Sequence, residues 1–158
     1  MENNCKEKLE NNFQSIHNMK LNNKPFCSIK NGMKTVELRL NDEKRKKVKV
    51  GDTIIFENID NLEKISVLVL KIHKFDNFEK LYEKIDKTLI GYSSEEIALS
   101  SDMEKYYSIE KQKKYGVLGI EFRITKLNQN LWYIVKILLN INKYILSNIK
   151  YLCKYKFY

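Results

Sequence analysis

The segment from Gly32 to Leu40 constrains the fold most, because a glycine is followed there by regular alternation of apolar and polar residues. Successive side chains of a β-strand point to opposite faces, so this alternation predicts a strand with one apolar and one polar face. The two faces hold, respectively, Val36, Leu38 and Leu40, and Thr35, Glu37 and Arg39. Lys34 comes just before the strand, where we expect it to stand at the mouth of a core. The segment predicts either a site or an ordinary half-buried strand with a solvated polar face.

The spacing of the polar residues is similar to that of a known family. Gly32, Lys34, Glu37 and Arg39 form a G-x-K-x-x-E-x-R pattern, which resembles the signature of the ASCH domain. Further segments resemble, in the same order, parts of bacterial and archaeal ASCH proteins; these segments are Asn41–Arg45, Val50–Phe56, Phe75–Leu81, Met103–Tyr107 and Tyr115–Ile120. The resemblance implies an α+β fold, a PUA-like β-barrel of about five or six strands with flanking short helices.

The same resemblance divides the chain into three parts. Residues 19–126 correspond to the ASCH-like domain, and we expect its first strand near Lys20 and Leu21. Residues 1–18 are polar and asparagine-rich, which predicts a loosely ordered extension. Residues 127–158 form a tail with no counterpart in the family.

Local patterns predict further elements within the domain. Residues 24–31 fit a short helix that Gly32 ends, and residues 77–85 fit another with Asn77 as its N-cap. Residues 65–72 carry apolar side chains at both odd and even positions, which predicts a strand covered on both faces.

Two further strands and one histidine complete the expected barrel. Residues 53–57 are predicted as a strand that follows a turn. Residues 117–124 alternate, which predicts a half-exposed strand that closes the barrel. His73 follows the strand at residues 65–72, and we expect it to be a hydrogen-bonded structural residue.

The resemblance also implies a function. PUA-like and ASCH domains are associated with RNA binding, some ASCH proteins hydrolyse the amide of N4-acylated cytidines, and some are linked to RNA cleavage. In the amidohydrolase branch the motif lysine pairs with a threonine three residues later and with a distant glutamate. Lys34 matches that lysine, but Glu37 stands at the position of the threonine. Binding to RNA or a nucleotide-like ligand is therefore the preferred hypothesis, while an amidohydrolase, an RNA-cleaving enzyme and a purely structural strand remain alternatives.

We expect the ligand- or RNA-binding residues to be Gly32, Lys34, Glu37, Arg39, Arg45 and Tyr107. Lys34 and Arg39 supply donors for phosphate or carbonyl oxygens. In an enzyme, Glu37 would be the general base and Lys34 would stabilise an oxyanion. Arg45 belongs to a basic run that is either a phosphate-contacting loop or a solvated one. Tyr107 either stacks on a base or packs in the core.

The composition favours an anionic partner. The net charge is +9, which suits nucleic acid or an acidic membrane surface, and residues 127–158 contribute +5 of it. The three cysteines show no C-x-x-C spacing and the chain has two histidines, so we predict neither a metal site nor a cofactor. The start lacks the basic and apolar regions of a signal peptide, so we expect a cytoplasmic protein.

The tail at residues 127–158 has a helical pattern. Lys136, Lys143 and Lys150 recur every seven residues, which keeps them on one face of an amphipathic helix. Polar residues interrupt the apolar run too often for a transmembrane helix. Three roles remain open for the apolar face: docking on the barrel, self-association, or peripheral contact with an anionic membrane.

Overall fold

The computed structural model describes residues 14–125, which form a curled five-stranded sheet with three short helices. The strands are β1 (Ile16–Leu21), β2 (Val36–Leu40), β3 (Thr53–Asn58), β4 (Lys64–Phe75) and β5 (Val117–Ile124). The helices are α1 (Asn23–Lys30), α2 (Phe78–Lys84) and α3 (Ile109–Tyr115), with short 3₁₀ helices η1 (Arg45–Lys47) and η2 (Ser100–Met103). This architecture confirms the predicted α+β fold of a PUA-like barrel with flanking short helices.

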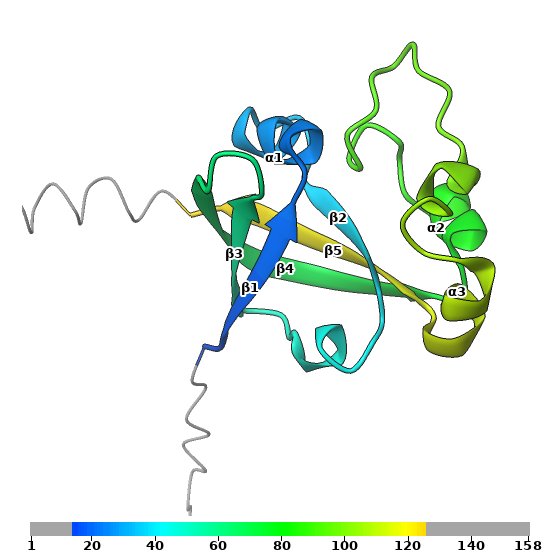
Figure 1. The fold of residues 1–158 in the computed structure, drawn as a ribbon, viewed down its shortest axis with the longest axis horizontal. Coiled ribbons are helices and arrows are strands. Elements are labelled where there is room, and N and C mark those ends of the chain that lie inside the picture. Colours follow the sequence, from blue (N-terminus) through cyan, green and yellow to red (C-terminus); the bar gives the residue numbers. More distant parts are fainter. Residues whose placement is uncertain (1–13, 126–158) are drawn as a thin grey trace, which may run out of the picture. The chain divides into compact units, whose positions relative to one another are not determined.

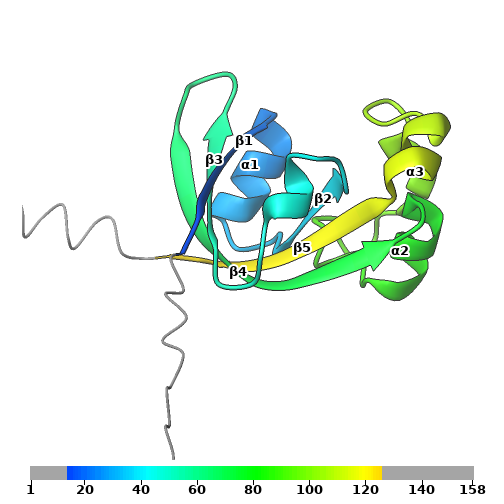
Figure 2. The ribbon, with the colours of Figure 1, turned by 90° about the horizontal axis from the view of Figure 1, so that it is seen from below.

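The strand order is β1-β3-β4-β5-β2, so β1 and β2 are the two edges of the sheet. The β1–β3 pair is parallel, and the other three pairs are antiparallel. Figures 1 and 2 show β4 and β5 side by side along the domain, with β3 at one end and α2 and α3 at the other. The sheet is a half-barrel, and its two edges are bridged by a side chain: the Arg39 guanidinium donates to the Lys20 carbonyl oxygen at 2.9 Å.

Buried apolar side chains form two clusters on opposite faces of β5. The inner cluster lies within the curl of the sheet around α1, and the outer cluster lies beneath α2. The inner cluster consists of Met19, Leu21, Phe26, Ile29, Val48, Ile54, Phe56, Val67, Val69, Leu118, Ile120 and Phe122. The outer cluster consists of Val36, Leu38, Leu40, Phe78, Leu81, Ile85, Ile90 and Val117. The half-barrel therefore has a core on each side of β5, the strand that pairs with the motif strand β2.

The register of β2 on β5 decides which face of the motif strand points inward. Glu37 pairs with Ile120 and Arg39 pairs with Leu118, both members of the inner cluster. Paired residues share a face of the sheet, so the charged face of β2 points into the curl. Its apolar face packs outward against α2.

The prediction that residues 65–72 form a strand covered on both faces is wrong. Val67 and Val69 are buried, whereas Leu70 is 41% exposed. The pairing with β5 shifts register between Val69 and Lys71, which marks a β-bulge. A bulge adds one residue and reverses the alternation, so Ile72 turns inward again and packs on the inner cluster. The reversal accounts for Ile72, whereas Leu68 lies before the bulge, on the face opposite Val67 and Val69.

The strand that is buried on both faces is instead β5, in its first half. Val117 belongs to the outer cluster and Leu118 to the inner cluster. Gly119 lies against the outer cluster, where an added Cβ would come within 2.7 Å of Ile85 Cδ1. From Glu121 onward the strand is half-exposed, as predicted.

The first strand also begins earlier than predicted. Residues 16–18 belong to β1 and pair in parallel with β3, so the predicted loose extension is wrong for them. The reason is a carboxylate far away in the sequence. Asp52 accepts hydrogen bonds from the Ser15 backbone N–H at 3.1 Å and the His17 Nε2 at 2.8 Å, which ties the start of β1 to the turn before β3.

The two predicted helices and the histidine are confirmed. α1 ends before Gly32, whose φ of 75° is the left-handed conformation that glycine tolerates. Asn77 caps α2 by accepting a hydrogen bond from the Lys80 backbone N–H at 2.9 Å. His73 is partly buried and pairs with Glu121 at 3.0 Å.

The structure's described residues, 14–125, contain no helix long and apolar enough to cross a membrane. The predicted amphipathic tail at residues 127–158 and most of the predicted N-terminal extension lie outside the described residues.

Candidate functional site

Three charged side chains of the motif form a buried row of alternating sign. Lys34 Nζ lies 3.5 Å from Glu37 Oε2, and Glu37 Oε1 lies 3.1 Å from Arg39 Nε. The side chains of Lys34, Glu37 and Arg39 are 8%, 7% and 11% exposed. Isolated charges this deep would be strongly disfavoured, so each of the three depends on its neighbour.

Arg39 connects this row to other parts of the fold. Its guanidinium donates to the Lys20 carbonyl oxygen of β1 and to the Tyr107 hydroxyl, at 2.9 Å and 3.4 Å. Burial lowers the pKa of Arg39, but the charge of Glu37 and the contact with Tyr107 raise it by more, so the pKa lies above its ordinary value. Arg39 therefore stays a cation while it holds the two edges of the half-barrel together.

Glu37 Oε2 and Arg39 Nε are buried, and neither atom has a hydrogen-bond partner among the described residues. The nearest cation to Glu37 Oε2 is the Lys34 ammonium at 3.5 Å. A buried acceptor without a partner costs about 1–3 kcal/mol. A ligand that donates a hydrogen bond to Glu37 would remove this cost.

These residues line a cavity of about 340 Å³, which we call the motif cleft. One side of the cleft is formed by β1, α1 and β2, and the other by α2, η2 and the segments before and after η2. The side chains relevant to chemistry are Lys34, Glu37, Arg39, Tyr82, Tyr92 and Tyr107. This size is in the range of small-molecule sites in proteins.

On the wall opposite the motif, three side chains are linked in a short series of hydrogen bonds. The Tyr82 and Tyr92 hydroxyls are 3.2 Å apart, and the Tyr92 hydroxyl donates to Asp102 Oδ2 at 3.0 Å. Burial raises the pKa of both hydroxyls, so they stay neutral. The sequence reasoning missed these residues because no motif or spacing connects them, and only the fold brings them to the cleft.

The segment before Tyr92 positions Lys34. The Lys34 ammonium donates to the Ile90 carbonyl oxygen at 2.8 Å. The Leu89 carbonyl oxygen accepts from the backbone N–H groups that follow Lys34 in the chain, each at 2.9 Å. Gly91 lies against the aliphatic stem, where an added Cβ would be 3.3 Å from Lys34 Cδ. The lysine is therefore fixed by a loop that lies 56 residues further along the chain.

Four of the predicted binding residues meet at the motif cleft, namely Lys34, Glu37, Arg39 and Tyr107. Tyr107 also stacks on Phe78, with ring centroids 5.7 Å apart, so it packs against the core while its hydroxyl faces Arg39.

Gly32 and Arg45, also predicted as binding residues, do not line the cleft. Gly32 is exposed and serves the turn after α1, where its N–H donates to the Ile29 carbonyl oxygen. Arg45 pairs with Asp42 at 2.6 Å within its own loop. Local contacts thus account for both residues.

Within residues 14–125, no group of histidine, cysteine or acidic side chains is arranged to hold a metal ion. The polar groups of the cleft are hydrogen-bond donors, hydrogen-bond acceptors and cations. Such a site suits an organic ligand with several polar atoms.

Comparison with known proteins gives a consistent result. The family model described as the ASCH domain matches residues 19–126. No curated protein matches the chain.

Solved structures are similar over the same region. The crystal structure of hypothetical protein PH0355 is 31% identical, covers 70% of this chain and 99% of its own, and has a TM-score of 0.60. The solution structure of protein PF0455 from Pyrococcus furiosus is 31% identical, with 70% and 98% coverage and a TM-score of 0.56. A crystal structure of a mutant ZmASCH protein from Zymomonas mobilis shares the fold at 14% identity, with 73% and 78% coverage and a TM-score of 0.52.

Proposed function

The chain belongs to the ASCH domain family, and on this premise we propose that it binds RNA or a nucleotide-like ligand in the motif cleft. One observation carries the proposal: Lys34, Glu37 and Arg39 form a buried charged row along a cavity of about 340 Å³. A row of charged side chains that served only to stabilise the fold could lie beneath apolar side chains. Here it lines an opening that tyrosine hydroxyls face from the other wall.

The chemistry of the walls suits a nucleotide. Neutral tyrosine hydroxyls at residues 82 and 92 and the carboxylate of Glu37 offer complementary hydrogen-bonding groups to a polar ring. Tyr106 lines the cleft and is 54% exposed, so its ring is accessible to a base that stacks on it. The net charge of +9 favours a polyanionic partner over a neutral one.

A second candidate is the hydrolysis of an amide on an N4-acylated cytidine or a related nucleoside. Glu37 Oε2, buried and without a hydrogen-bond partner, lies 3.5 Å from the Lys34 ammonium. A carboxylate in this position could activate a water while the ammonium stabilises the developing oxyanion. The same two groups would serve an RNA-cleaving enzyme.

The binding proposal is tested with Tyr92→Phe, which removes one hydroxyl from the cleft and keeps the ring. We expect the affinity for a short single-stranded RNA, measured by fluorescence anisotropy, to fall about fivefold, because one hydrogen bond is worth about 1 kcal/mol. Tyr115→Phe is the matched control, since Tyr115 is also partly buried but does not line the cleft. Equal affinities for both variants, or an unaltered protein that does not bind RNA, would contradict the proposal.

The two candidates are separated by incubating the protein with N4-acetylcytidine and following deacetylation by chromatography. A binding protein leaves the compound intact. Turnover that disappears in Lys34→Ala would favour the amidohydrolase over the binding proposal.

A further inference from the structure

The buried charges of the motif cleft balance one another. Lys34 and Arg39 are cations, and Glu37 lies between them. On the opposite wall, Asp102 accepts a hydrogen bond from Tyr92. We call the part of the cleft lined by Lys34, Glu37, Arg39 and Asp102 its floor. A phosphate bound there would meet two carboxylates and two cations, and both cations already form ion pairs with Glu37. Taking an anion out of water is repaid only where cations are free to pair with it, so the floor disfavours phosphate.

The floor instead offers an acceptor to a neutral group. Glu37 Oε2 has no hydrogen-bond partner among the described residues, although the side chain is buried, with only 7% of its surface exposed. If another cation took the place of Lys34 or Arg39 beside Glu37, the displaced cation would be left buried without its ion pair. The missing partner is therefore an uncharged N–H or O–H donor, because it completes the carboxylate and leaves the charge balance unchanged.

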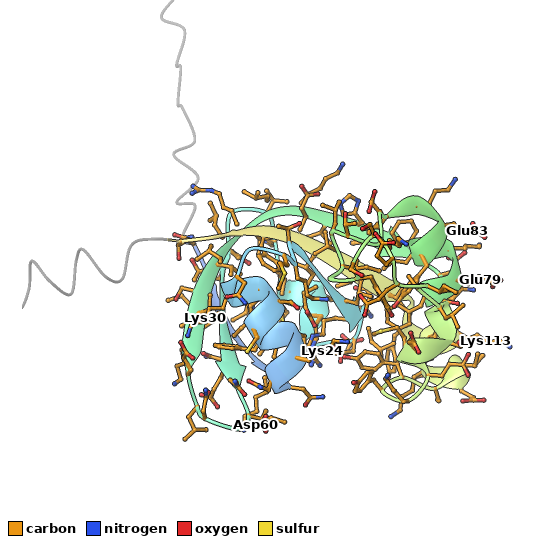
Figure 3. The ribbon with its side chains drawn as sticks, turned by 90° about the horizontal axis from the view of Figure 1, so that it is seen from above. Lys24, Lys30, Asp60, Glu79, Glu83 and Lys113 are labelled. Carbon is orange, nitrogen blue, oxygen red and sulfur yellow. The ribbon has the colours of Figure 1, made fainter. Side chains whose placement is uncertain are left out.

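Two exposed cations with no close carboxylate partner among the described residues lie at the rim of the cleft. The side chain of Lys24, in the first turn of α1, is 88% exposed, and its nearest carboxylate is Glu96 at 3.9 Å. Lys105 follows η2, is exposed, and lies over the Tyr106 ring with its ammonium 5.4 Å from the centroid. Both lysines line the cleft. Figure 3 shows Lys24 at the end of α1 that lies toward α2 and α3, with Lys30 at the other end.

We propose that the motif cleft is divided between two parts of one nucleotide unit. The floor, through Glu37, receives an uncharged group that donates a hydrogen bond, and the rim lysines Lys24 and Lys105 contact the phosphate. This inference rests on the proposed function and reverses the role that the motif alone suggested for Lys34 and Arg39 as phosphate ligands. The motif cations hold Glu37 in place, and the salt dependence of binding comes from the rim.

The test measures the affinity for a mixed-sequence single-stranded RNA by fluorescence anisotropy at salt concentrations between about 50 and 200 mM. In the double variant Lys24→Gln with Lys105→Gln, we expect the slope of log K against log salt to fall by about 1.4 in magnitude, because each lost phosphate contact on a single strand removes about 0.7. Both lysines are exposed, so the variant keeps the fold.

The matched control is Lys30→Gln with Lys64→Gln. It removes the same net charge from exposed lysines that pair with Glu63 and Glu57 and do not line the cleft. We expect its slope to equal that of the unaltered protein. A rim variant that keeps the full slope, or a control that loses as much, would overturn the inference.

The floor is tested with Glu37→Gln at the same salt concentrations, alongside a thermal melt that shows the variant to be folded. We expect weaker binding at every salt concentration and an unchanged slope, since the lost contact is to an uncharged group. Lys34→Gln is measured in the same way, and a slope smaller by about 0.7 in that variant would place phosphate beside Lys34 on the floor and overturn the inference. If the unaltered protein binds no RNA at any of these salt concentrations, the proposed function itself is refuted.

Discussion

At the scale of single residues, Glu37 has two tasks that conflict. Its carboxylate lies between Lys34 and Arg39 and keeps both cations buried. One of its oxygens nevertheless has no hydrogen-bond partner in the described part of the chain and lies beside a cavity. A buried carboxylate that served only to stabilise the edge of a sheet would be expected to accept hydrogen bonds through both oxygens. The unpartnered atom is why we read the row as a site in addition to a structural support.

Gly91 is the residue whose substitution tests how Lys34 is positioned. Its φ is 100°, and an added Cβ would press on the lysine stem at 3.3 Å. We expect Gly91→Ala to lower the free energy of unfolding by about 1–2 kcal/mol through backbone strain and to weaken RNA binding by displacing Lys34. Urea denaturation and fluorescence anisotropy measure the two effects.

Gly51→Ala is the control for this prediction. Gly51 has a similar φ of 91°, but no atom lies within 4 Å of its added Cβ. It should lose similar stability and keep its affinity for RNA. If both variants bind RNA equally well, Gly91 does not act through Lys34.

At the scale of elements, Asp52 connects β1 to the turn before β3. It accepts hydrogen bonds from the backbone N–H groups of Ser15 and Lys49 and from the His17 ring. Burial raises the pKa of Asp52, but these hydrogen bonds lower it by more, so the pKa lies below its ordinary value of 3.8. A carboxylate whose pKa is depressed by folding stabilises the folded state above the unfolded pKa and stops doing so as the pH falls through the folded pKa.

We therefore expect the free energy of unfolding to fall as the pH drops below about 4, and to fall less steeply in Asp52→Asn. Urea denaturation at a series of pH values measures both curves. At neutral pH the variant should be less stable than the unaltered protein, since an amide accepts these hydrogen bonds less strongly than a carboxylate. Parallel curves for the two proteins would mean that Asp52 does not contribute to the acid sensitivity.

At the scale of the whole molecule, the described domain contains a core on each side of β5. The members of both clusters that the structure describes lie between residues 19 and 122, so a chain that ends after Thr125 retains all of them. The tail at residues 127–158 remains a sequence prediction of an amphipathic helix that serves association.

We expect a chain shortened after Thr125 to keep a cooperative thermal unfolding transition, because both clusters stay complete. Circular dichroism measures the transition. Light scattering and flotation with anionic liposomes then compare the shortened and full chains for self-association and membrane contact. Loss of the cooperative transition would show that the tail belongs to the core. A full chain that is monomeric and does not bind liposomes would leave docking on its own barrel as the role of the tail.

The sequence by itself determined the features that depend on near neighbours. Alternation from Val36 to Leu40 defined the motif strand, because side-chain direction in a strand has a period of two residues. Asn77 marked the start of α2 through a contact three residues away. The resemblance of the motif and of the ordered segments around it to ASCH proteins then predicted the fold and the family.

Only the tertiary structure decided what meets the motif strand. The bulge after Val69 reversed the faces of β4, and the register on β5 turned Glu37 and Arg39 into the curl. The contact of Lys34 with Ile90 spans 56 residues, and that of Arg39 with Tyr107 spans 68. Local periodicity carries no information about such distant pairs, because they depend on how loops close over the sheet. The motif could therefore be found in the sequence, whereas the cleft could be found only in the fold.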